Sequence, residues 1–257
     1  MTESDDHRLA HDLAAATGAV LLEVRRRFIT PNGSTDDRAA ELQTAMKAAG
    51  DSEAHELIMR RLAAARPDDA ILSEEGADDL ARLGAARTWI VDPLDGTREF
   101  SEPPREDWAV HIALVIDGQP VAGAVSLPAI GVTFSTATPP VLGPASPDAP
   151  RVIVSRTRRP QAAVDLAAAL DALYIEMGSA GAKAMAVIQG QADIYAHSGG
   201  QYEWDNCAPV AVARAAGLHC SRLDGSPLVY NNENPYLPDL LICRAEWAER
   251  SLAILNR

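Results

Sequence analysis

A short segment in the first half of the chain carries two carboxylates close together. Asp92 and Asp95 follow the apolar run Trp89-Ile90-Val91 and precede Gly96 and Thr97. Two like charges about 4 Å apart repel each other by roughly 4 kcal/mol at an effective dielectric constant near 20. Such a pair therefore requires a cation, a shared proton or an open, solvated loop.

An ordinary turn is the alternative explanation of this segment. The apolar run predicts a strand, and Pro93 would end its ladder because proline has no N–H to donate. Asp95-Gly96 is a common turn dipeptide, and Asp92-Pro93 is typical of a strand end. On these residues alone both explanations remain open, and the other acidic residues of the chain decide between them.

Two more carboxylates stand at similar junctions. Glu74 follows the predicted strand Ala70–Ser73, and Asp205 lies at the start of a predicted helix, where an N-cap is the simpler role for it alone. Carboxylate oxygens suit Mg²⁺, which keeps several waters and also binds phosphate oxygens. The six histidines are scattered and form no cluster for zinc. The acids together favour a magnesium site over a turn.

The motif Asp92-Pro93-Leu94-Asp95-Gly96-Thr97 resembles the signature of the inositol monophosphatase superfamily of magnesium-dependent, lithium-sensitive phosphatases. The next residues, Arg98-Glu99-Phe100, resemble its 3'(2'),5'-bisphosphate nucleotidase branch, most closely the actinobacterial form. That branch removes the 3'-phosphate from 3'-phosphoadenosine 5'-phosphate (PAP). The similarity extends from about Asp51 to Arg244. It implies a mixed α/β fold, namely an α+β layered sandwich with the αβαβα architecture of the sugar phosphatases.

The resemblance also implies a cofactor of two to three Mg²⁺ ions. The ligands it implies for the first two are Glu74, Asp92, the carbonyl of Leu94, Asp95 and Asp205. A third, weaker ion would lie near Glu74 and Asp51. Ala48 stands where the family commonly has threonine, three residues before this last acid.

Catalysis is implied to depend on Thr97, Asp51 and Glu74. Thr97 and Asp51 resemble the pair that orients and deprotonates a metal-activated water. Two cations about 4 Å apart can hold the attacking and leaving oxygens of a phosphoryl displacement. Without the motif, a helix cap would be an equally good role for Thr97.

Substrate contacts are implied by weaker matches. The amides of Gly96 and Thr97 would point at phosphate oxygens. Gly178 to Lys183 resembles the nucleotide-site segment of the nucleotidases, and Ser155 to Arg158 resembles a Ser-Arg-x-His segment, with Arg158 where His is usual. The residues expected to touch substrate are Asp95, Gly96, Thr97, Ser155, Arg156, Ser179, Lys183 and Glu203. Arg156 or Arg158 would bind a second phosphate, although solvated surface residues remain the alternative for Lys183 and both arginines.

The expected reaction is magnesium-dependent hydrolysis of PAP to AMP and phosphate, which would relieve product buildup in sulfate assimilation. The nearest alternative is the same chemistry on inositol monophosphate or fructose 1,6-bisphosphate, with broad specificity as a further option. An alternative of another class is a non-catalytic protein that senses a nucleotide or sugar phosphate.

Composition limits the partners of the 257-residue chain. Its formal charge of −13 argues against a nucleic-acid polymer, whose binding requires neutralised phosphates. Apolar residues make up 47% of the chain, but no run of eighteen is uninterrupted, and the first thirty residues are too charged for a leader. Three widely spaced cysteines suit a reducing compartment. We expect a cytoplasmic protein with a small phosphorylated substrate and no membrane partner. The oligomeric state cannot be read from the sequence, and a homodimer is one option because related enzymes are often dimers.

The elements of the first half are predicted from periodicity. Helical spacing covers Asp5 to Phe28, Thr30 to Thr35 reads as a flexible loop, and Asp37 to Ala49 fits a short helix or a lid. A second amphipathic helix is expected to begin at Asp51 and end at Pro67. Alternation between Trp108 and Thr138, with a turn at Asp117-Gly118, predicts antiparallel strands.

Five prolines between Thr138 and Pro150 suggest a domain boundary. We expect an N-terminal α+β domain at residues 1–145 with most metal ligands, and a C-terminal α/β domain at residues 146–257 with substrate-binding elements. The elements expected in the second are strands at Arg151–Val154, Ala192–Ala196 and Leu240–Cys243, helices at Gln161–Leu170, Gly178–Gln189 and Trp204–Ala216, and a C-terminal helix.

Overall fold

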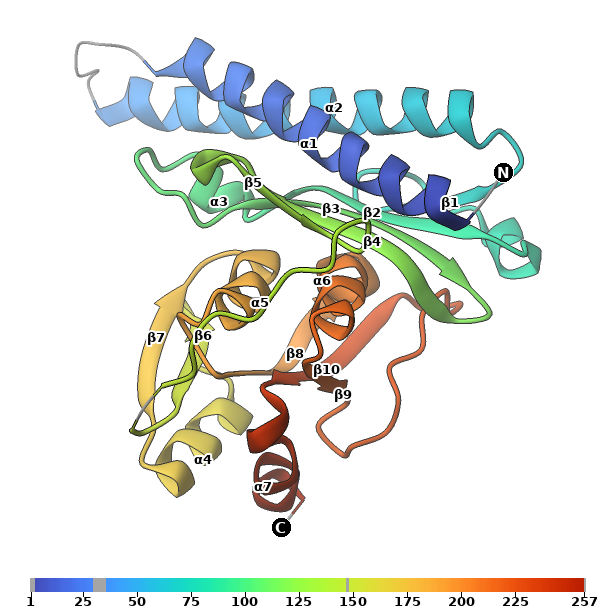
Figure 1. Ribbon diagram of the computed structural model, residues 1–257. Coiled ribbons are helices and arrows are strands. Elements are labelled where there is room, and N and C mark those ends of the chain that lie inside the picture. Colours follow the sequence, from blue (N-terminus) through green and yellow to red (C-terminus); the bar gives the residue numbers. More distant parts are fainter. Residues whose placement is uncertain (1–2, 30–35, 147, 257) are drawn as a thin grey trace.

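Two five-stranded sheets and the helices that cover them form five layers in the computed structural model, which describes residues 3–29, 36–146 and 148–256 (Figure 1). The elements of the first half are α1 (Glu3–Phe28), α2 (Asp36–Ala65), β1 (Ala70–Ser73), a 3-10 helix (Leu80–Gly84), β2 (Thr88–Asp95), α3 (Thr97–Phe100), β3 (Ala109–Ile116), β4 (Gln119–Leu127), a second 3-10 helix (Pro128–Ile130) and β5 (Val132–Ser135). The strand order of this sheet is β1-β2-β3-β4-β5. Only β1 and β2 pair in parallel.

The second half builds the other sheet. Its elements are β6 (Arg151–Ser155), α4 (Gln161–Leu170), β7 (Leu173–Met177), α5 (Ala180–Ile188), β8 (Ile194–Tyr202), α6 (Glu203–Ala215), β9 (His219–Ser221), β10 (Tyr236–Cys243) and α7 (Ala245–Leu255). The strand order is β7-β6-β8-β10-β9. Strand β6 runs parallel to β7 and β8, whereas β10 runs antiparallel to β8 and β9.

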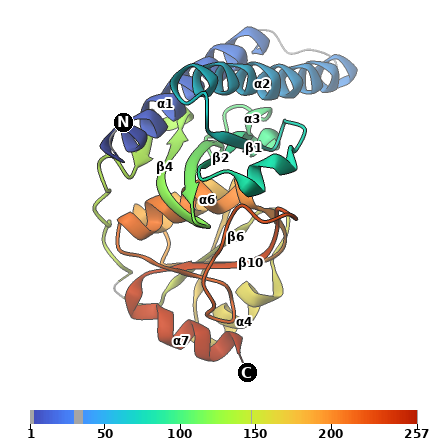
Figure 2. The ribbon, with the colours of Figure 1, turned by 90° about the vertical axis from the view of Figure 1, so that its right-hand side faces the viewer.

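Three hydrophobic clusters hold the layers together. One packs α1 and α2 on the first sheet, through residues such as Leu13, Ile58 and Val110. A second fills the middle layer, where α5 and α6 lie between the sheets (Figure 1), and Figure 2 shows α6 in this layer from another side. The third packs α4 and α7 on the outer face of the second sheet. This stacking confirms the predicted αβαβα architecture.

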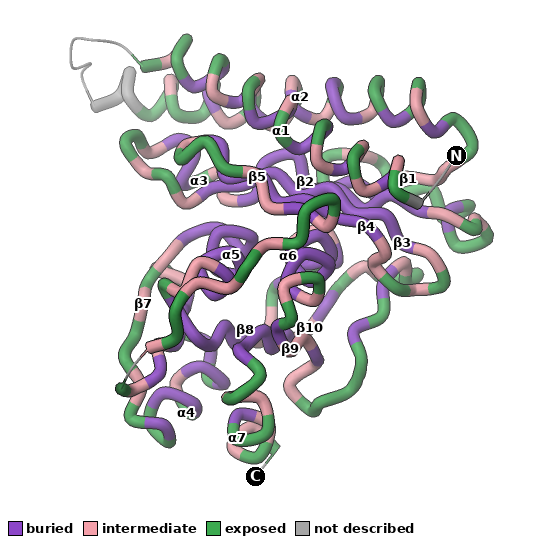
Figure 3. The backbone as a smooth tube through the Cα atoms, viewed as in Figure 1, coloured by how far each residue is buried: buried purple, intermediate pink, exposed green. Residues whose placement is uncertain are grey.

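Helix α5 shows why the middle layer needs an unusual sequence. All of its residues are buried, and it is drawn almost wholly in purple in Figure 3. A helix between two sheets has no solvent face, so it is apolar around its whole circumference. Lys183 is the one charged residue within α5.

The predicted helix start at Asp51 is wrong. Helix α2 runs unbroken from Asp36 to Ala65, so Asp51 lies in its interior and the residues offered as a lid belong to the same helix. A glycine inside a helix costs only about 1 kcal/mol relative to alanine. Buried Met46 and Ala54, on either side of Gly50, pack on the same core and outweigh that cost. The loop predicted at residues 30–35 lies outside the described residues.

The proline-rich segment after β5 leads from the first sheet to the second, and the domain boundary expected there stays a prediction. Among the described helices, none combines the length and apolar character that crossing a bilayer requires. The turn at Asp117-Gly118 is a two-residue hairpin between β3 and β4, as predicted, and both residues have positive φ.

We predict that Gly123→Ala destabilises the protein by about 1–3 kcal/mol, because overpacking a close contact has this cost. A Cβ at Gly123 in β4 would lie 2.7 Å from the Cβ of Ala211, which belongs to α6. Urea unfolding measures the loss. Gly84→Ala is the control because its Cβ would meet no heavy atom within 4 Å. Equal stability of the two variants would contradict the close packing of α6 on β4.

Candidate active site

The last residues of β2 form a bulge between Asp92 and Asp95. Asp92 pairs with His111 of β3 and Asp95 pairs with Ala109, so the two residues between the acids are left out of the ladder. The sequence prediction that Pro93 ends the ladder is therefore only partly right, since pairing resumes at Asp95. The bulge lets the N–H of Leu94 donate to Oδ1 of Asp92, at 3.0 Å.

Gly96 turns the chain from this bulge into α3. Its φ of 83° lies in the left-handed region, which glycine adopts without steric cost. The turn places Thr97 so that its hydroxyl donates to the carbonyl oxygen of Leu94, at 3.1 Å. The carbonyl expected to bind metal and the hydroxyl expected to act in catalysis therefore lie side by side.

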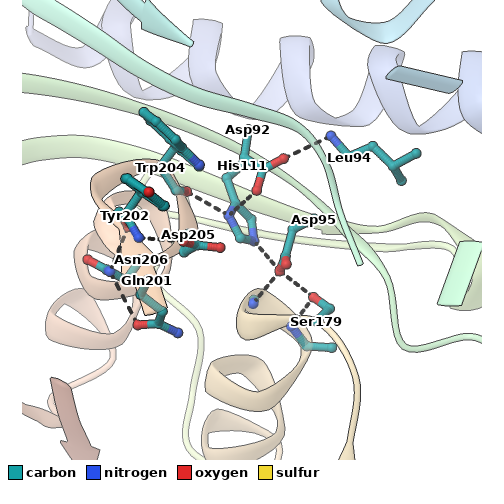
Figure 4. A network of polar contacts seen from close by, with 12 residues as sticks. Asp92, Leu94, Asp95, His111, Ser179, Gln201, Tyr202, Trp204, Asp205 and Asn206 are labelled. Atoms are coloured by element: carbon teal, nitrogen blue, oxygen red, sulfur yellow. Dashed lines mark hydrogen bonds and ion pairs between the residues drawn. The ribbon is translucent and has the colours of Figure 1, made fainter. Parts of the chain in front are cut away.

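Three of the acids that the sequence singled out come together here (Figure 4). Asp92, Asp95 and Asp205 each offer a carboxylate oxygen within 4.8 Å of the others. Asp205 comes from the first turn of α6, where one oxygen accepts the N–H of Tyr202 at 2.6 Å. Glu74 follows β1 and lies close enough to Asp92 that each affects the other's pKa.

Four carboxylates in this small space make the charged forms costly. Burial, then the neighbouring acids, raises the pKa of Asp205 to about 7. Burial and the charge of Glu74 raise the pKa of Asp92 well above its usual value. All donors are oxygens, including the carbonyl of Leu94, which is the donor set that Mg²⁺ prefers. The residues present therefore fit the expected cofactor.

His111 is a site residue that the sequence interpretation missed. Its buried Nδ1 donates to the carbonyl of Trp204 at 3.0 Å, and its Nε2 lies 3.2 Å from Oδ2 of Asp95. Burial lowers the pKa of His111, but Asp95 outweighs burial, so the net shift is upward. The available signal was the strand register, which sets His111 opposite Asp92.

Asp95 is held differently from the other acids. Burial alone would raise its pKa, but His111, Lys183 and Ser179 together keep it at about 2. The Ser179 hydroxyl donates to Oδ2 of Asp95 at 2.5 Å, and the N–H of Gly181 donates to the same oxygen at 2.7 Å. The start of α5 thus fixes this carboxylate in its ionised form.

Asp51 reaches the site from the interior of α2. It lies within hydrogen-bonding reach of the Thr97 hydroxyl, so the structure brings together the two residues expected to handle the water. Burial, followed by the charges of Glu75 and Glu74, raises the pKa of Asp51 to about 7. An acid with this pKa can exchange a proton near neutral pH.

A pocket of about 370 Å³ opens beside the acids. Its lining includes Asp95, Gly96, Arg98, Glu99, Ser155, Thr157, Arg158, Gly178, Ser179, Ala180, Lys183, His197, Gly200, Gln201 and Asp205. Asp95 and Asp205 of the carboxylate cluster belong to this lining, and Arg158 and Lys183 add positive charge to it. The pocket therefore suits a ligand with more than one anionic group.

Lys183 is buried within this lining. Its ammonium group donates to the carbonyl oxygens of Gly178 and Ser179, and it lies 5.5 Å from the centre of the Tyr195 ring. Burial lowers the pKa of Lys183 to about 8, although Asp95 favours the charged form. The solvated surface lysine that the sequence left open as an alternative is wrong, because only 5% of this residue is exposed.

The two arginines expected near a second phosphate separate in the structure. Arg156 donates to Glu99 at 2.6 Å and to Glu102 at 2.7 Å, and it does not line the pocket. Its charge is thus already matched by two carboxylates, and its contact with substrate stays a prediction. Arg158 does line the pocket, where it donates to the carbonyl of Gly199 and lies 3.1 Å from Nε2 of His197.

Glu203 is likewise hydrogen-bonded within the protein. Its carboxylate accepts the backbone N–H groups of Asn231 and Asn232 and the side-chain amide of Asn232. Only 1% of Glu203 is exposed, and it does not line the pocket. On the first turn of α6 this residue faces the loop before β10, and its contact with substrate stays a prediction.

Residues 4–256 match the inositol monophosphatase family. The chain belongs to this family. A relative from Mycobacterium bovis, named 3'-phosphoadenosine 5'-phosphate phosphatase, is 56% identical over 209 residues, which cover 78% of each chain. A relative of the same name from Mycobacterium leprae is 47% identical and covers 99% of this chain and 94% of its own.

The fold of this inositol monophosphatase family member is also found among solved structures. CysQ from Bacteroides thetaiotaomicron, described as a bacterial member of the family, superposes with a TM-score of 0.76 at 26% identity. The superposition covers 94% of this chain and 97% of that one. The first sheet, the second sheet and the helices between them are thus a shared family architecture.

We predict that Mg²⁺ binds this family member more weakly as the pH falls. Asp51 and Asp205, each with a pKa of about 7 in the metal-free protein, are mostly ionised at pH 8 and mostly protonated at pH 6. Protons then compete with the cation, so the dissociation constant should rise about tenfold for each acid that binds metal. Calorimetric titration at both pH values measures it.

Repeating this titration in buffers of different ionisation enthalpy counts the protons released. A dissociation constant that does not change between pH 6 and pH 8 would contradict the role of these acids as ligands or neighbours of the metal.

Proposed function

We propose that this chain is a Mg²⁺-dependent phosphomonoesterase that hydrolyses the 3'-phosphate of PAP to AMP and phosphate. The observation that carries the proposal is the pocket that joins a carboxylate cluster to buried positive charge. Relatives that are 47% and 56% identical bear the name of this activity, which supports the same choice of substrate. The family match supports the same reaction class.

The residues that would hold two Mg²⁺ ions are Glu74, Asp92, the Leu94 carbonyl, Asp95 and Asp205. Asp51 and Glu74 would hold a third. When bound, the ions supply positive charge that stabilises the phosphoryl oxygens as charge develops on them. The raised pKa values of Asp92 and Asp205 support this assignment, because they show that ionising these carboxylates together is costly without cations.

Asp51 and Thr97 would act on the water. The attacking oxygen forms a bond to phosphorus, the bond from phosphorus to the 3'-oxygen breaks, and the leaving oxygen takes a proton from solvent. Asp51 accepts a proton from the water, and its pKa of about 7 suits this role. The Thr97 hydroxyl, beside both Asp51 and the Leu94 carbonyl, orients the water.

The 5'-phosphate of PAP would lie toward Arg158 and Lys183. Both line the pocket, and guanidinium groups suit phosphate because they offer a planar set of donors. Ser155 and Ser179 line the same pocket. A cytoplasmic location and a homodimer stay predictions from the sequence.

We predict that PAP gives a higher kcat/KM than inositol 1-phosphate or fructose 1,6-bisphosphate when phosphate release is measured on each substrate.

We predict that Asp95→Asn abolishes the activity while the fold survives. The asparagine removes a charge from the carboxylate cluster without changing packing volume. Phosphate release measures turnover, and circular dichroism checks the fold. Asp165→Asn, on the exposed face of α4, is the control.

Better turnover of the sugar phosphates would contradict the substrate assignment. A protein that binds PAP in the presence of Mg²⁺ but releases no phosphate would support the sensor instead, and an active Asp95→Asn variant would contradict the metal site.

We predict that Arg158→Gln raises KM for PAP by about 10–100-fold, because a hydrogen bond to a charged group contributes about 1.5–3 kcal/mol. The same variant should leave KM for 3'-AMP unchanged, since that nucleotide has no 5'-phosphate. Steady-state kinetics on both substrates measures the difference. Arg159→Gln, which removes an exposed pair with Glu176, is the control. An equal rise in KM for both nucleotides would contradict a contact between Arg158 and the 5'-phosphate.

A further inference from the structure

Arg82 links two segments that are far apart in the sequence. It lies in the 3-10 helix that follows Glu74, and only 1% of it is exposed. Its guanidinium donates twice to Asp78, at 2.6 and 2.9 Å, and once to Oδ1 of Asn231, at 2.7 Å. The side-chain amide of Asn231 donates back to the carbonyl of Arg82 at 3.1 Å. The pairing is therefore reciprocal.

Asn231 continues the connection to α6. Its backbone N–H donates to Oε2 of Glu203 at 2.6 Å. The neighbouring Asn232 donates its own N–H and its side-chain amide to Oε1, at 2.9 and 2.7 Å. Both carboxylate oxygens of Glu203 are thus occupied, two residues before Asp205.

The two charged groups at the ends of this connection, Arg82 and Glu203, are buried and hydrogen-bonded. The hydrogen bonds to Asp78 raise the pKa of Arg82 and burial lowers it, but the charges of Asp78 and Glu203 also raise it, so the net shift is upward. A buried guanidinium or carboxylate without partners would cost several kcal/mol, so the pairing keeps these groups in fixed places. One end holds the segment after Glu74, and the other holds the first turn of α6.

We propose that Arg82, Asn231 and Glu203 form a bridge that positions Asp205 relative to Glu74 and thereby sets the affinity for Mg²⁺. The bridge rests on the metal site of the proposed function. Its members touch neither the ion nor the substrate, so they are positioning residues. Groups that hold metal ligands in place typically change metal affinity by 10–100-fold when they are removed.

Asn231→Gly tests the bridge with little change to the backbone. Asn231 has a φ of 63°, which glycine tolerates, and its N–H can still donate to Glu203. The variant loses both side-chain contacts with Arg82. We expect the calorimetric dissociation constant for Mg²⁺ to rise about tenfold in the purified full chain, while kcat at saturating Mg²⁺ stays within about twofold of the wild type.

Two controls separate positioning from general destabilisation. Asn234→Gly changes the same loop but removes only a contact with the N–H of Tyr236. Leu166→Val weakens the hydrophobic cluster that α4 forms on the outer face of the second sheet, on the other side of that sheet from α6 and its Asp205. Both should bind Mg²⁺ as the wild type does, even where urea unfolding shows a stability loss equal to that of Asn231→Gly.

An unchanged dissociation constant for Asn231→Gly would overturn the bridge, as would equal weakening by Leu166→Val. The failure of the proposed function looks different. A wild type that binds Mg²⁺ but hydrolyses no phosphate ester would reject that function, and the binding comparison would still decide on the bridge.

Discussion

Repulsion among Asp92, Asp95 and Asp205 is the constraint on which the rest of the structure depends. Separate elements carry these acids: two come from the bulge at the end of β2, and one comes from the first turn of α6. At a few ångströms such charges repel by several kcal/mol even in a partly polar medium. The packing of α6 between the two sheets keeps the carboxylates together despite this cost.

The protein distributes the charge unevenly. His111, the Ser179 hydroxyl and the N–H of Gly181 stabilise ionised Asp95, whose pKa is about 2, whereas Asp205 titrates near 7. Without cations, protons can therefore neutralise part of the cluster. Loss of these protons makes the same acids available as metal ligands, which would link metal affinity to pH. Beside them, buried Lys183 supplies positive charge that does not depend on metal.

The local parts of the site could be predicted from the sequence, and the long-range parts could not. The motif from Asp92 to Thr97 contains its own turn chemistry, and the alternation of β3 and β4 fixed most of the first sheet. His111 was missed because its role depends on strand register. Glu203 faces the loop before β10 whereas Asp205 faces the other acids, because residues two apart on a helix point roughly 200° apart. Gly50 suggested a helix break that core packing overrides. Strand β7 was not predicted, because the alternation of apolar and polar residues in this half-exposed edge strand is too weak to recognise.

The most direct test of a cation-dependent acid cluster is a crystal structure of the protein soaked in Mn²⁺, with anomalous diffraction used to find the ions. The account predicts anomalous peaks between Asp92, Asp95 and Asp205, and another beside Glu74, within about 2.0–2.3 Å of their oxygens. Ions bound only at other surface carboxylates, with these side chains turned away from one another, would contradict it.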